Sequence, residues 1–177
     1  MGLLDLLKNM KKSDQEAKLL ILGLDNAGKT TILKTLSQEE ATNTIPTQGF
    51  NVKAVVNDSF KLNLWDIGGQ EEIRKYWVHY FDKVSGLVFV VDSSDDERVQ
   101  ENNKELKILM EEKLLEDVPL LVFANKQDLM GLEVDEIVNK LDLNEIKNRK
   151  WSIFACSALK DEGVSDGMKW LISNLKV

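Results

Sequence analysis

The stretch KLLILGLDNAGKT (residues 18–30) decides the fold of this chain. It begins with a nearly continuous apolar run, KLLILG (18–23), which is typical of a strand that is buried on both faces of a sheet. A loop with a second glycine at Gly28 follows, and a helical pattern occupies 29–36. Strand, glycine loop and helix in this order predict the first unit of a parallel α/β sheet.

The rest of the chain continues this alternation. Apolar, β-rich runs predict further strands at 50–56, 60–66, 86–92, 119–125 and 151–156. Helical patterns are predicted at 97–116, 134–141 and 164–175. The second and third strands flank Asn-Asp-Ser and form a predicted hairpin. We therefore expect an α/β fold with a six-stranded, mostly parallel sheet, one antiparallel edge strand and helices on both faces.

Composition limits the classes of function. The formal net charge of −7 argues against a nucleic-acid polymer as partner, since phosphate backbones need clustered Lys and Arg. The single cysteine, Cys156, excludes a disulfide framework and fits a reducing compartment. The start of the chain has no basic region before its apolar residues, so it does not resemble a signal peptide. No apolar run is long enough to span a bilayer. We expect a cytoplasmic domain whose membrane contact, if any, is peripheral.

The loop GLDNAGKT fits the phosphate-loop pattern G-x-x-x-x-G-K-[ST]. Its glycines let backbone N–H groups close around phosphate oxygens, and Lys29 adds a positive charge. The Thr30 hydroxyl is a hard oxygen ligand for Mg²⁺. A helix start with incidental glycines is the alternative, but the strand before the loop and the helix after it favour phosphate binding. The predicted phosphate-binding residues here are Gly23, Asp25, Asn26, Ala27, Gly28, Lys29, Thr30 and Thr31.

A second motif, WDIGGQ, follows the strand predicted at 60–66. Asp66 can hold Mg²⁺ through water, and the backbone N–H of Gly69 can approach a γ-phosphate. Gln70 can orient an attacking water, and we assign it the catalytic role. A short D-x-x-G is in isolation more typical of a turn. Its place at the next strand end after the phosphate loop favours a functional site.

Two further motifs predict recognition of a purine base. In NKQD, the Asp128 carboxylate can accept hydrogen bonds from guanine N1–H and its N2 amine, which adenine lacks. The aliphatic stem of Lys126 can cover the purine face while its charge reaches solvent. Asn125 can tie this loop to the phosphate loop. Ser157 and Ala158, after the last strand, offer the backbone N–H of Ala158 or of its neighbours to guanine O6. A polar turn is the alternative for each motif taken alone.

Together with MGLL, PTQGFN, FKLNLWDIGGQ and NKQDL, these motifs resemble the ADP-ribosylation-factor-like GTPases over essentially the whole chain. The resemblance implies the Ras-like P-loop fold and a GTP/GDP switch that needs Mg²⁺. It implies that Thr47 is a second metal-binding hydroxyl. It also implies an interswitch hairpin that shifts register between nucleotide states, with Phe50, Trp65 and Tyr80 as its aromatic effector surface.

The resemblance also implies partners. The segment between the first helix and the hairpin contains no arginine, so we expect slow intrinsic hydrolysis that an activating protein accelerates with its own arginine. An exchange factor and GDI-like lipid-binding carriers are implied as well. The implied function is the release of lipidated cargo in ciliary or membrane trafficking by a monomer, with possible association with the cilium, Golgi or microtubules. Alternatives are a binding module with negligible hydrolysis, a regulator of tubulin folding, or an ATP-using P-loop enzyme, against which Asp128 argues.

The chain departs from the family pattern after the glutamine of the second motif. Glu71 and Glu72 stand where a basic residue is usual, and Lys75 replaces a proline. We hypothesise that these changes alter the charge that regulators must present. Arg74 lies between them, and we expect it to make a structural or partner contact rather than to act as an internal arginine finger.

The opening residues form a predicted amphipathic switch helix (1–16) that precedes the GTPase domain (17–177). Its apolar face consists of Leu3, Leu6, Leu7 and Met10. Acylation of Gly2 would call for Ser or Thr at position six, where this chain has Leu6, so we expect an unmodified helix. Such a helix is a weak, reversible membrane anchor. We expect it to dock on the domain with GDP and to be released with GTP.

Overall fold

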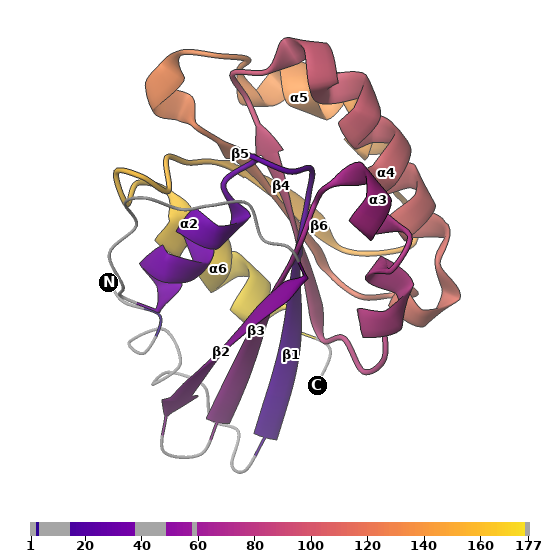
Figure 1. Ribbon diagram of the computed structural model, residues 1–177, viewed down its shortest axis with the longest axis vertical. Helices are drawn as coiled ribbons and strands as arrows, with labels where there is room; N and C mark the ends of the chain where they lie inside the picture. The colour runs from indigo at the N-terminus through magenta and orange to yellow at the C-terminus, as the bar shows by residue number, and fades with distance from the viewer. Residues whose placement is uncertain (1–2, 4–14, 38–48, 58–59, 176–177) are drawn as a thin grey trace.

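The computed structural model describes residues 3, 15–37, 49–57 and 60–175, which form one six-stranded sheet with helices on both faces (Figure 1). The strands are β1 (Gln15–Leu22), β2 (Phe50–Asn57), β3 (Phe60–Ile67), β4 (Gly86–Asp92), β5 (Leu120–Asn125) and β6 (Trp151–Ala155). Their order in the sheet is β2-β3-β1-β4-β5-β6. The edge strand β2 is antiparallel to β3, whereas the other neighbouring pairs are parallel. The predicted fold class is confirmed.

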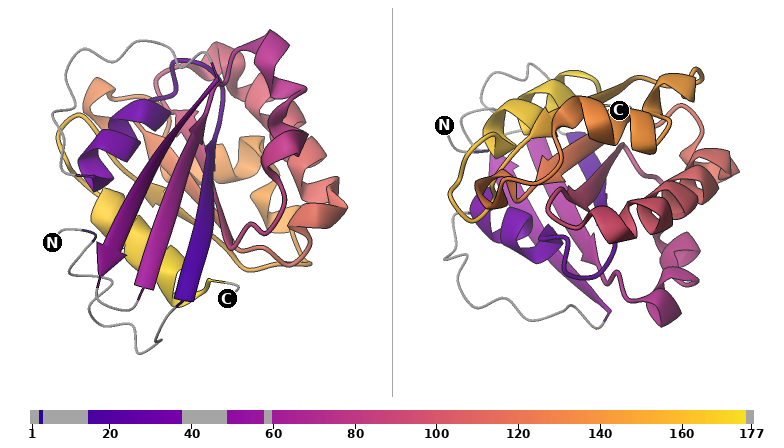
Figure 2. Two further views of the ribbon diagram at one scale, coloured as in Figure 1. Left: turned by 60° about the horizontal axis from the view of Figure 1, so that its bottom comes forward. Right: turned by 90° about the horizontal axis from the view of Figure 1, so that it is seen from above.

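Helices cover the sheet from both sides. The α-helices are α2 (Lys29–Leu36), α3 (Glu71–Arg74), α4 (Val99–Glu111), α5 (Val134–Lys140) and α6 (Val164–Ser173). The described part of the chain also contains five short 3-10 turns: η1 (Trp77–Tyr80), η2 (Asp96–Arg98), η3 (Lys113–Leu115), η4 (Gln127–Leu129) and η5 (Leu143–Glu145). Helices α2 and α6 lie on one face of the sheet, and α3 and α4 lie on the other (Figure 2).

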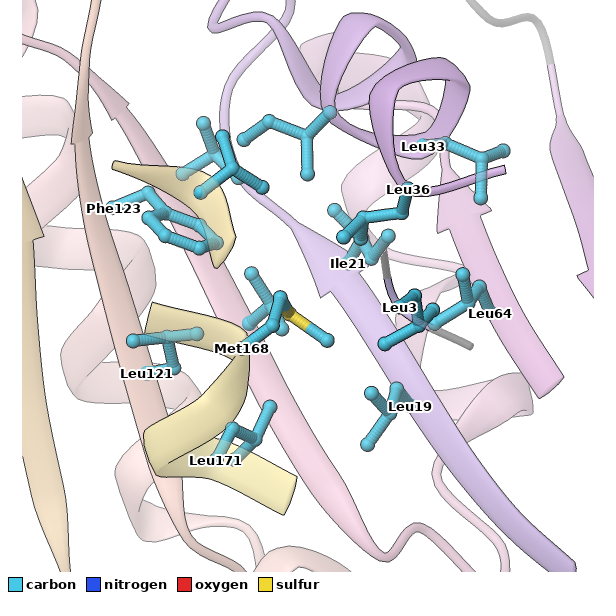
Figure 3. Packing of buried hydrophobic residues seen from close by; sticks show 14 of the residues in the cluster. Leu3, Leu19, Ile21, Leu33, Leu36, Leu64, Leu121, Phe123, Met168 and Leu171 are labelled. Atoms are coloured by element: carbon cyan, nitrogen blue, oxygen red, sulfur yellow. The ribbon is translucent and has the colours of Figure 1, made fainter. Parts of the chain in front are cut away.

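The unbroken apolar runs supply both faces because side chains alternate along a strand. In β1, Leu19 and Ile21 belong to the buried cluster under α2 and α6 (Figure 3). Leu20 and Leu22 belong to the cluster under α4 and α5. These four side chains are completely buried. A strand buried on both sides has no polar alternation, which is why the sequence pattern predicts it well.

The helix predicted over 97–116 is shorter than expected. Helix α4 ends at Glu111, and Glu112 adopts an extended conformation before the turn η3. The cause is tertiary: the guanidinium of Arg149 donates hydrogen bonds to the carbonyls of Met110 (3.1 Å) and Leu115 (2.8 Å). The bond to Met110 satisfies a carbonyl in the last turn of α4 that a longer helix would have paired internally.

Leu3 is buried, with 3% of its surface exposed, and lies beside Leu64 and Leu19 in the cluster under α2 and α6 (Figure 3). Leu6, Leu7 and Met10 lie outside the described residues, so their predicted place on an amphipathic face remains a prediction. Strand β1 begins at Gln15, two residues before the predicted start of the domain. Among the described residues, no helix is both long and apolar enough to cross a membrane.

Candidate functional site

The described residues of the predicted nucleotide site lie at or just beyond the carboxyl ends of β1, β3, β5 and β6, at one edge of the sheet. The loop after β1 curls tightly. Gly23 and Gly28 have positive φ angles of 149° and 99°. A Cβ on Gly23 would lie 2.4 Å from the carbonyl oxygen of Val90, and one on Gly28 would lie 2.3 Å from Nδ2 of Asn125. Both positions therefore need glycine, as expected of a loop that closes around phosphate.

Lys29 begins α2 and is buried, with 6% of its surface exposed. Its ammonium donates a hydrogen bond of 2.7 Å to the carbonyl of Leu24 inside the loop. Burial lowers the pKa of this ammonium to about 8, although the charges of Asp66 and Asp25 favour its protonated form. A bound phosphate would add the negative charge that restores the protonated form. The loop thus positions this cation through one of its own carbonyls.

Two predicted metal ligands meet beside this lysine. The Thr30 hydroxyl donates a hydrogen bond of 2.6 Å to Oδ2 of Asp66, which is completely buried at the end of β3. A hydroxyl and a carboxylate are the hard oxygen donors that Mg²⁺ prefers, so the residues present fit this metal. Thr47, the other predicted ligand, lies outside the described residues.

The second motif packs against the phosphate loop. The N–H of Asp25 donates to the carbonyl of Gly69 (3.1 Å), and a Cβ on Gly69 would lie 2.2 Å from the carbonyl oxygen of Gly23. Trp77, which the sequence analysis did not single out, donates its indole N–H to the carbonyl of Gly68 (2.8 Å). Gln70 precedes α3, and its Oε1 is buried without a hydrogen-bond partner in the described part of the chain.

Arg74 makes structural contacts, as the sequence analysis expected. It is 8% exposed, and its Nε donates to the carbonyl of Gly69 at 2.8 Å. Its Nη1 lies 2.7 Å from Glu101 and 3.4 Å from Glu105, both on α4. This guanidinium therefore connects the second motif to α4.

Asn125 joins the predicted base-binding loops to the phosphate loop, as proposed from the sequence. It is 2% exposed, and its Nδ2 donates to the carbonyl of Ala27 (3.0 Å). Its Oδ1 accepts from the backbone N–H of Ala158 (3.0 Å). Because that N–H is engaged here, the neighbours of Ala158 are the remaining backbone candidates for guanine O6.

The Asp128 carboxylate, which is predicted to recognise the base, has a buried hydrogen-bond donor beside it. Ser157, which is 2% exposed, donates its hydroxyl to Oδ1 of Asp128 at 2.8 Å. Ser157 therefore orients Asp128.

The Lys126 ammonium, which the sequence predicts to reach solvent, has two oxygen partners, and 24% of the side chain is exposed. Its Nζ donates to the carbonyl of Asn26 (2.6 Å) and lies 2.8 Å from Oδ2 of Asp92. Asp92 ends β4 directly opposite Asn125 in the β4–β5 register. Asp92 has no role that its sequence pattern predicts, and its place at a strand end next to this edge is the available signal.

Arg98, at the end of η2, is another residue that sequence reasoning missed. Its Nη2 lies 2.7 Å from the Asp25 carboxylate, and its Nη1 donates to the Asp25 carbonyl at 3.1 Å. The two residues are distant in the sequence, so no local pattern joins them.

The three predicted effector-surface aromatics form one cluster beside the second motif. The rings of Phe50 and Trp65 are 5.5 Å apart, those of Phe50 and Tyr80 5.6 Å, and those of Trp65 and Tyr80 6.0 Å. Phe50 is 52% exposed, which is high for so large an apolar side chain. The ammonium of Lys18 lies 5.0 Å from the Trp65 ring centroid, within the range of a cation–π contact.

Comparison with known proteins identifies a matching family and several similar proteins. Residues 3–175 match the family described as "Arf: ADP-ribosylation factor family". A relative from Chlamydomonas reinhardtii named ADP-ribosylation factor-like protein 3 is 53% identical over 99% of this chain and 100% of its own length. A protein of the same name from Caenorhabditis elegans is 52% identical over 99% of this chain and 97% of its own. The solved structure of the Arl6 small GTPase from Trypanosoma brucei, with the bound nucleotide analogue GppNp, has a TM-score of 0.82 and 32% identity, covering 90% of this chain and 96% of that one.

Proposed function

Because this chain belongs to the ADP-ribosylation factor family of GTP-hydrolysing switches, we propose that the loops at the carboxyl edge of its sheet bind GTP and GDP together with Mg²⁺. One observation carries the proposal: the Asn125 side chain forms hydrogen bonds both to Ala27 in the phosphate loop and to Ala158 in the loop after β6. A ligand with phosphates at one end and a base at the other fits loops that are held together in this way.

We assign the residues as follows. The phosphate-binding set is Gly23, Asp25, Asn26, Ala27, Gly28, Lys29, Thr30, Thr31, Thr47 and Gly69. The guanine-binding set is Asn125, Lys126, Asp128, Ser157 and Ala158. Thr30 and Thr47 would hold Mg²⁺ directly and Asp66 through water. When bound, the metal supplies positive charge at the β- and γ-phosphate oxygens.

In hydrolysis, water attacks the γ-phosphorus and the bond to the β–γ bridging oxygen breaks, which leaves GDP and inorganic phosphate. Gln70 orients the water, and Lys29 stabilises charge that develops on the phosphate oxygens. The arginines nearest the phosphate loop are engaged in ion pairs, Arg74 with Glu101 and Arg98 with Asp25. This supports an activating protein as the source of a catalytic arginine.

The output of the switch is proposed to lie in two places. The exposed Phe50 and its neighbours Trp65 and Tyr80 offer an aromatic surface to effectors, which we propose are GDI-like carriers that release lipidated cargo. The names of the two relatives support this branch of the family. The buried Leu3 supports a first segment that docks on the domain in one nucleotide state and contacts membranes weakly in the other. A monomer in the cytoplasm, at the cilium, Golgi or microtubules, fits this role.

Regulators are proposed to carry a cationic surface. Glu71 and Glu72 are exposed in α3, directly after Gln70. The double substitution Glu71→Arg and Glu72→Lys should therefore weaken binding to the chain's own activating protein and exchange factor. Unchanged binding to all of them would rule out this charge preference.

Single-turnover hydrolysis tests the assignment of Gln70. Protein loaded with γ-labelled GTP should release phosphate slowly, and Gln70→Leu should slow this release by at least about tenfold. Gln100→Leu is the matched control, because Gln100 is exposed on α4, and it should behave as the unaltered protein. Equal rates for all three proteins would refute the role of Gln70. Nucleotide binding without phosphate release above a protein-free control would favour the alternative of a binding module that scarcely hydrolyses.

A further inference from the structure

Asp25 places a carboxylate inside the phosphate loop. Its backbone N–H donates to the carbonyl of Gly69, and Gly69 packs so closely that a Cβ there would lie 2.5 Å from the Asp25 nitrogen. Gly69 is the residue assigned to the γ-phosphate. Asp25 therefore lies on the γ-phosphate side of the loop, where a free carboxylate would repel the ligand.

The structure compensates this charge with a guanidinium from another part of the chain. Arg98 contacts Asp25 twice, with Nη2 2.7 Å from the carboxylate and Nη1 donating to the carbonyl at 3.1 Å. Arg74 is a weaker partner, since its Nη2 is 3.5 Å from the same carboxylate oxygen and its Nη1 bonds to Glu101. Burial raises the pKa of the Asp25 carboxyl, but the hydrogen bond and charge of Arg98 outweigh burial and leave the pKa below its ordinary value.

Arg98 is also held by contacts outside the phosphate loop. Its Nε lies 3.0 Å from Oε2 of Glu101, one turn further along the chain. Its backbone carbonyl accepts from Nδ2 of Asn102 (3.1 Å), a buried residue of α4. The guanidinium is therefore fixed by the start of α4 and holds Asp25 from outside the loop.

We propose that Arg98 is a positioning residue that neutralises the Asp25 carboxylate, directs it away from the γ-phosphate and so sets the preference of the site between GTP and GDP. This inference rests on the proposed nucleotide function. Without Arg98, the carboxylate faces the ligand with Arg74 as its remaining partner. The γ-phosphate adds negative charge to GTP, so the loss of binding affinity is larger for GTP than for GDP.

The test compares the affinities for fluorescent GDP and for the fluorescent, non-hydrolysable GTP analogue GppNp. In Arg98→Gln, which keeps most of the side-chain length and loses the charge, the ratio of GppNp affinity to GDP affinity should fall about tenfold. Adding Asp25→Asn to Arg98→Gln should return the ratio to within about threefold of its original value, because the carboxylate no longer needs compensation. Arg98→Lys keeps the positive charge but loses the guanidinium's two parallel donors, so the affinity ratio should fall by an intermediate amount. This variant replaces Arg98→Gln in the test if the glutamine variant does not fold.

Lys140→Gln is the matched control. Lys140 pairs with Asp96 at 2.8 Å, in the same 3-10 turn as Arg98, but does not contact Asp25. Its removal loosens the turn without exposing the carboxylate, so the ratio should stay unchanged. Three results would each overturn the inference. The affinity ratio could stay unchanged in the folded Arg98 variants, it could fall equally in Lys140→Gln, or Asp25→Asn could fail to restore it. If the unaltered protein binds neither nucleotide, the proposed function itself fails, which is a distinguishable result.

Discussion

The Thr30 hydroxyl donates a 2.6 Å hydrogen bond to the buried carboxylate of Asp66, so that the first turn of α2 contacts the end of β3. These residues are remote in the sequence, and they meet because β1 and β3 are neighbouring parallel strands. The contact places two oxygen donors where the site would hold Mg²⁺.

The first prediction concerns this contact. Thr30→Asn should weaken Mg²⁺ binding and should reduce GTP affinity more than GDP affinity, since the metal would offset the additional negative charge of the γ-phosphate. We expect about tenfold more Mg²⁺ to be needed to retain GDP, measured by nucleotide release during a metal titration. Ser173→Ala removes a helical hydroxyl that bonds to the carbonyl of Lys169, far from the site, and should have no effect. The same Mg²⁺ requirement in both variants would contradict the metal assignment.

The second prediction concerns the Ser157–Asp128 hydrogen bond. Ser157→Ala should lower GDP affinity by about tenfold, because the carboxylate loses the donor that orients it. Discrimination between GDP and IDP, whose base lacks the N2 amine, should fall as well, and a purely structural role would leave this ratio unchanged. Competition binding with the two nucleotides measures both effects. A weaker GDP affinity with intact GDP/IDP discrimination would show that Ser157 does not position Asp128.

The third prediction is a pH dependence from Lys29. Its pKa in the folded protein is lowered to about 8, and bound phosphate should raise it again. Well below pH 8 the ammonium is already charged and binding takes up no proton there. As the pH rises through about 8, the free protein loses this proton, so GDP binding takes up a proton and its affinity falls.

Calorimetry in two buffers of different ionisation enthalpy, between about pH 7 and pH 8.5, measures this proton uptake. Lys34→Gln, on the same helix but partly exposed, should leave the uptake unchanged. Proton release, or no change in uptake across this range, would contradict the lowered pKa. In the nucleotide-free protein the same shift predicts that the contribution of Lys29 to stability rises with pH between about 8 and 10.5, because the unfolded chain then binds more protons.

Much of this site could be predicted from the sequence because local patterns encode it. The run at 18–23 and the glycines after it specify strand, loop and helix within a short stretch, and Gly23 and Gly28 have the close contacts that require glycine. Asn125 joins the two loops as expected.

The rest depends on contacts between distant segments. Arg98 in η2 binds the Asp25 carboxylate, and Asp92 at the end of β4 forms an ion pair with Lys126, which follows β5. Neither pair has a sequence pattern, since an ion pair between distant residues depends on the completed sheet. The early end of α4 has the same origin, because Arg149, which is distant in the sequence, binds the carbonyl of Met110 in the last turn of the helix.

The fourth prediction concerns Leu3. Replacing this buried side chain by alanine should lower the free energy of unfolding of the GDP-bound protein by about 2–4 kcal/mol, through lost burial and a cavity. If the first segment is released with GTP, the loss should be much smaller in the GppNp-bound protein. Denaturant unfolding of both states measures the difference. Leu114→Ala, at a position 57% exposed, should cost less than about 0.5 kcal/mol in either state. Equal losses from Leu3→Ala in the two states would contradict nucleotide-dependent release.

The most direct test of the central claim is a change of base preference at Asp128. Competition binding should compare GDP, XDP and ADP for the unaltered protein, for Asp128→Asn and for the control Asp135→Asn, whose side chain is exposed on α5. The account predicts that the unaltered protein and the control prefer GDP. It predicts that Asp128→Asn loses at least about 100-fold in GDP affinity and gains affinity for XDP, because an amide donor then faces the donor groups of guanine but matches the O2 acceptor of xanthine. An unchanged order of base preference in Asp128→Asn would contradict the guanine-nucleotide site.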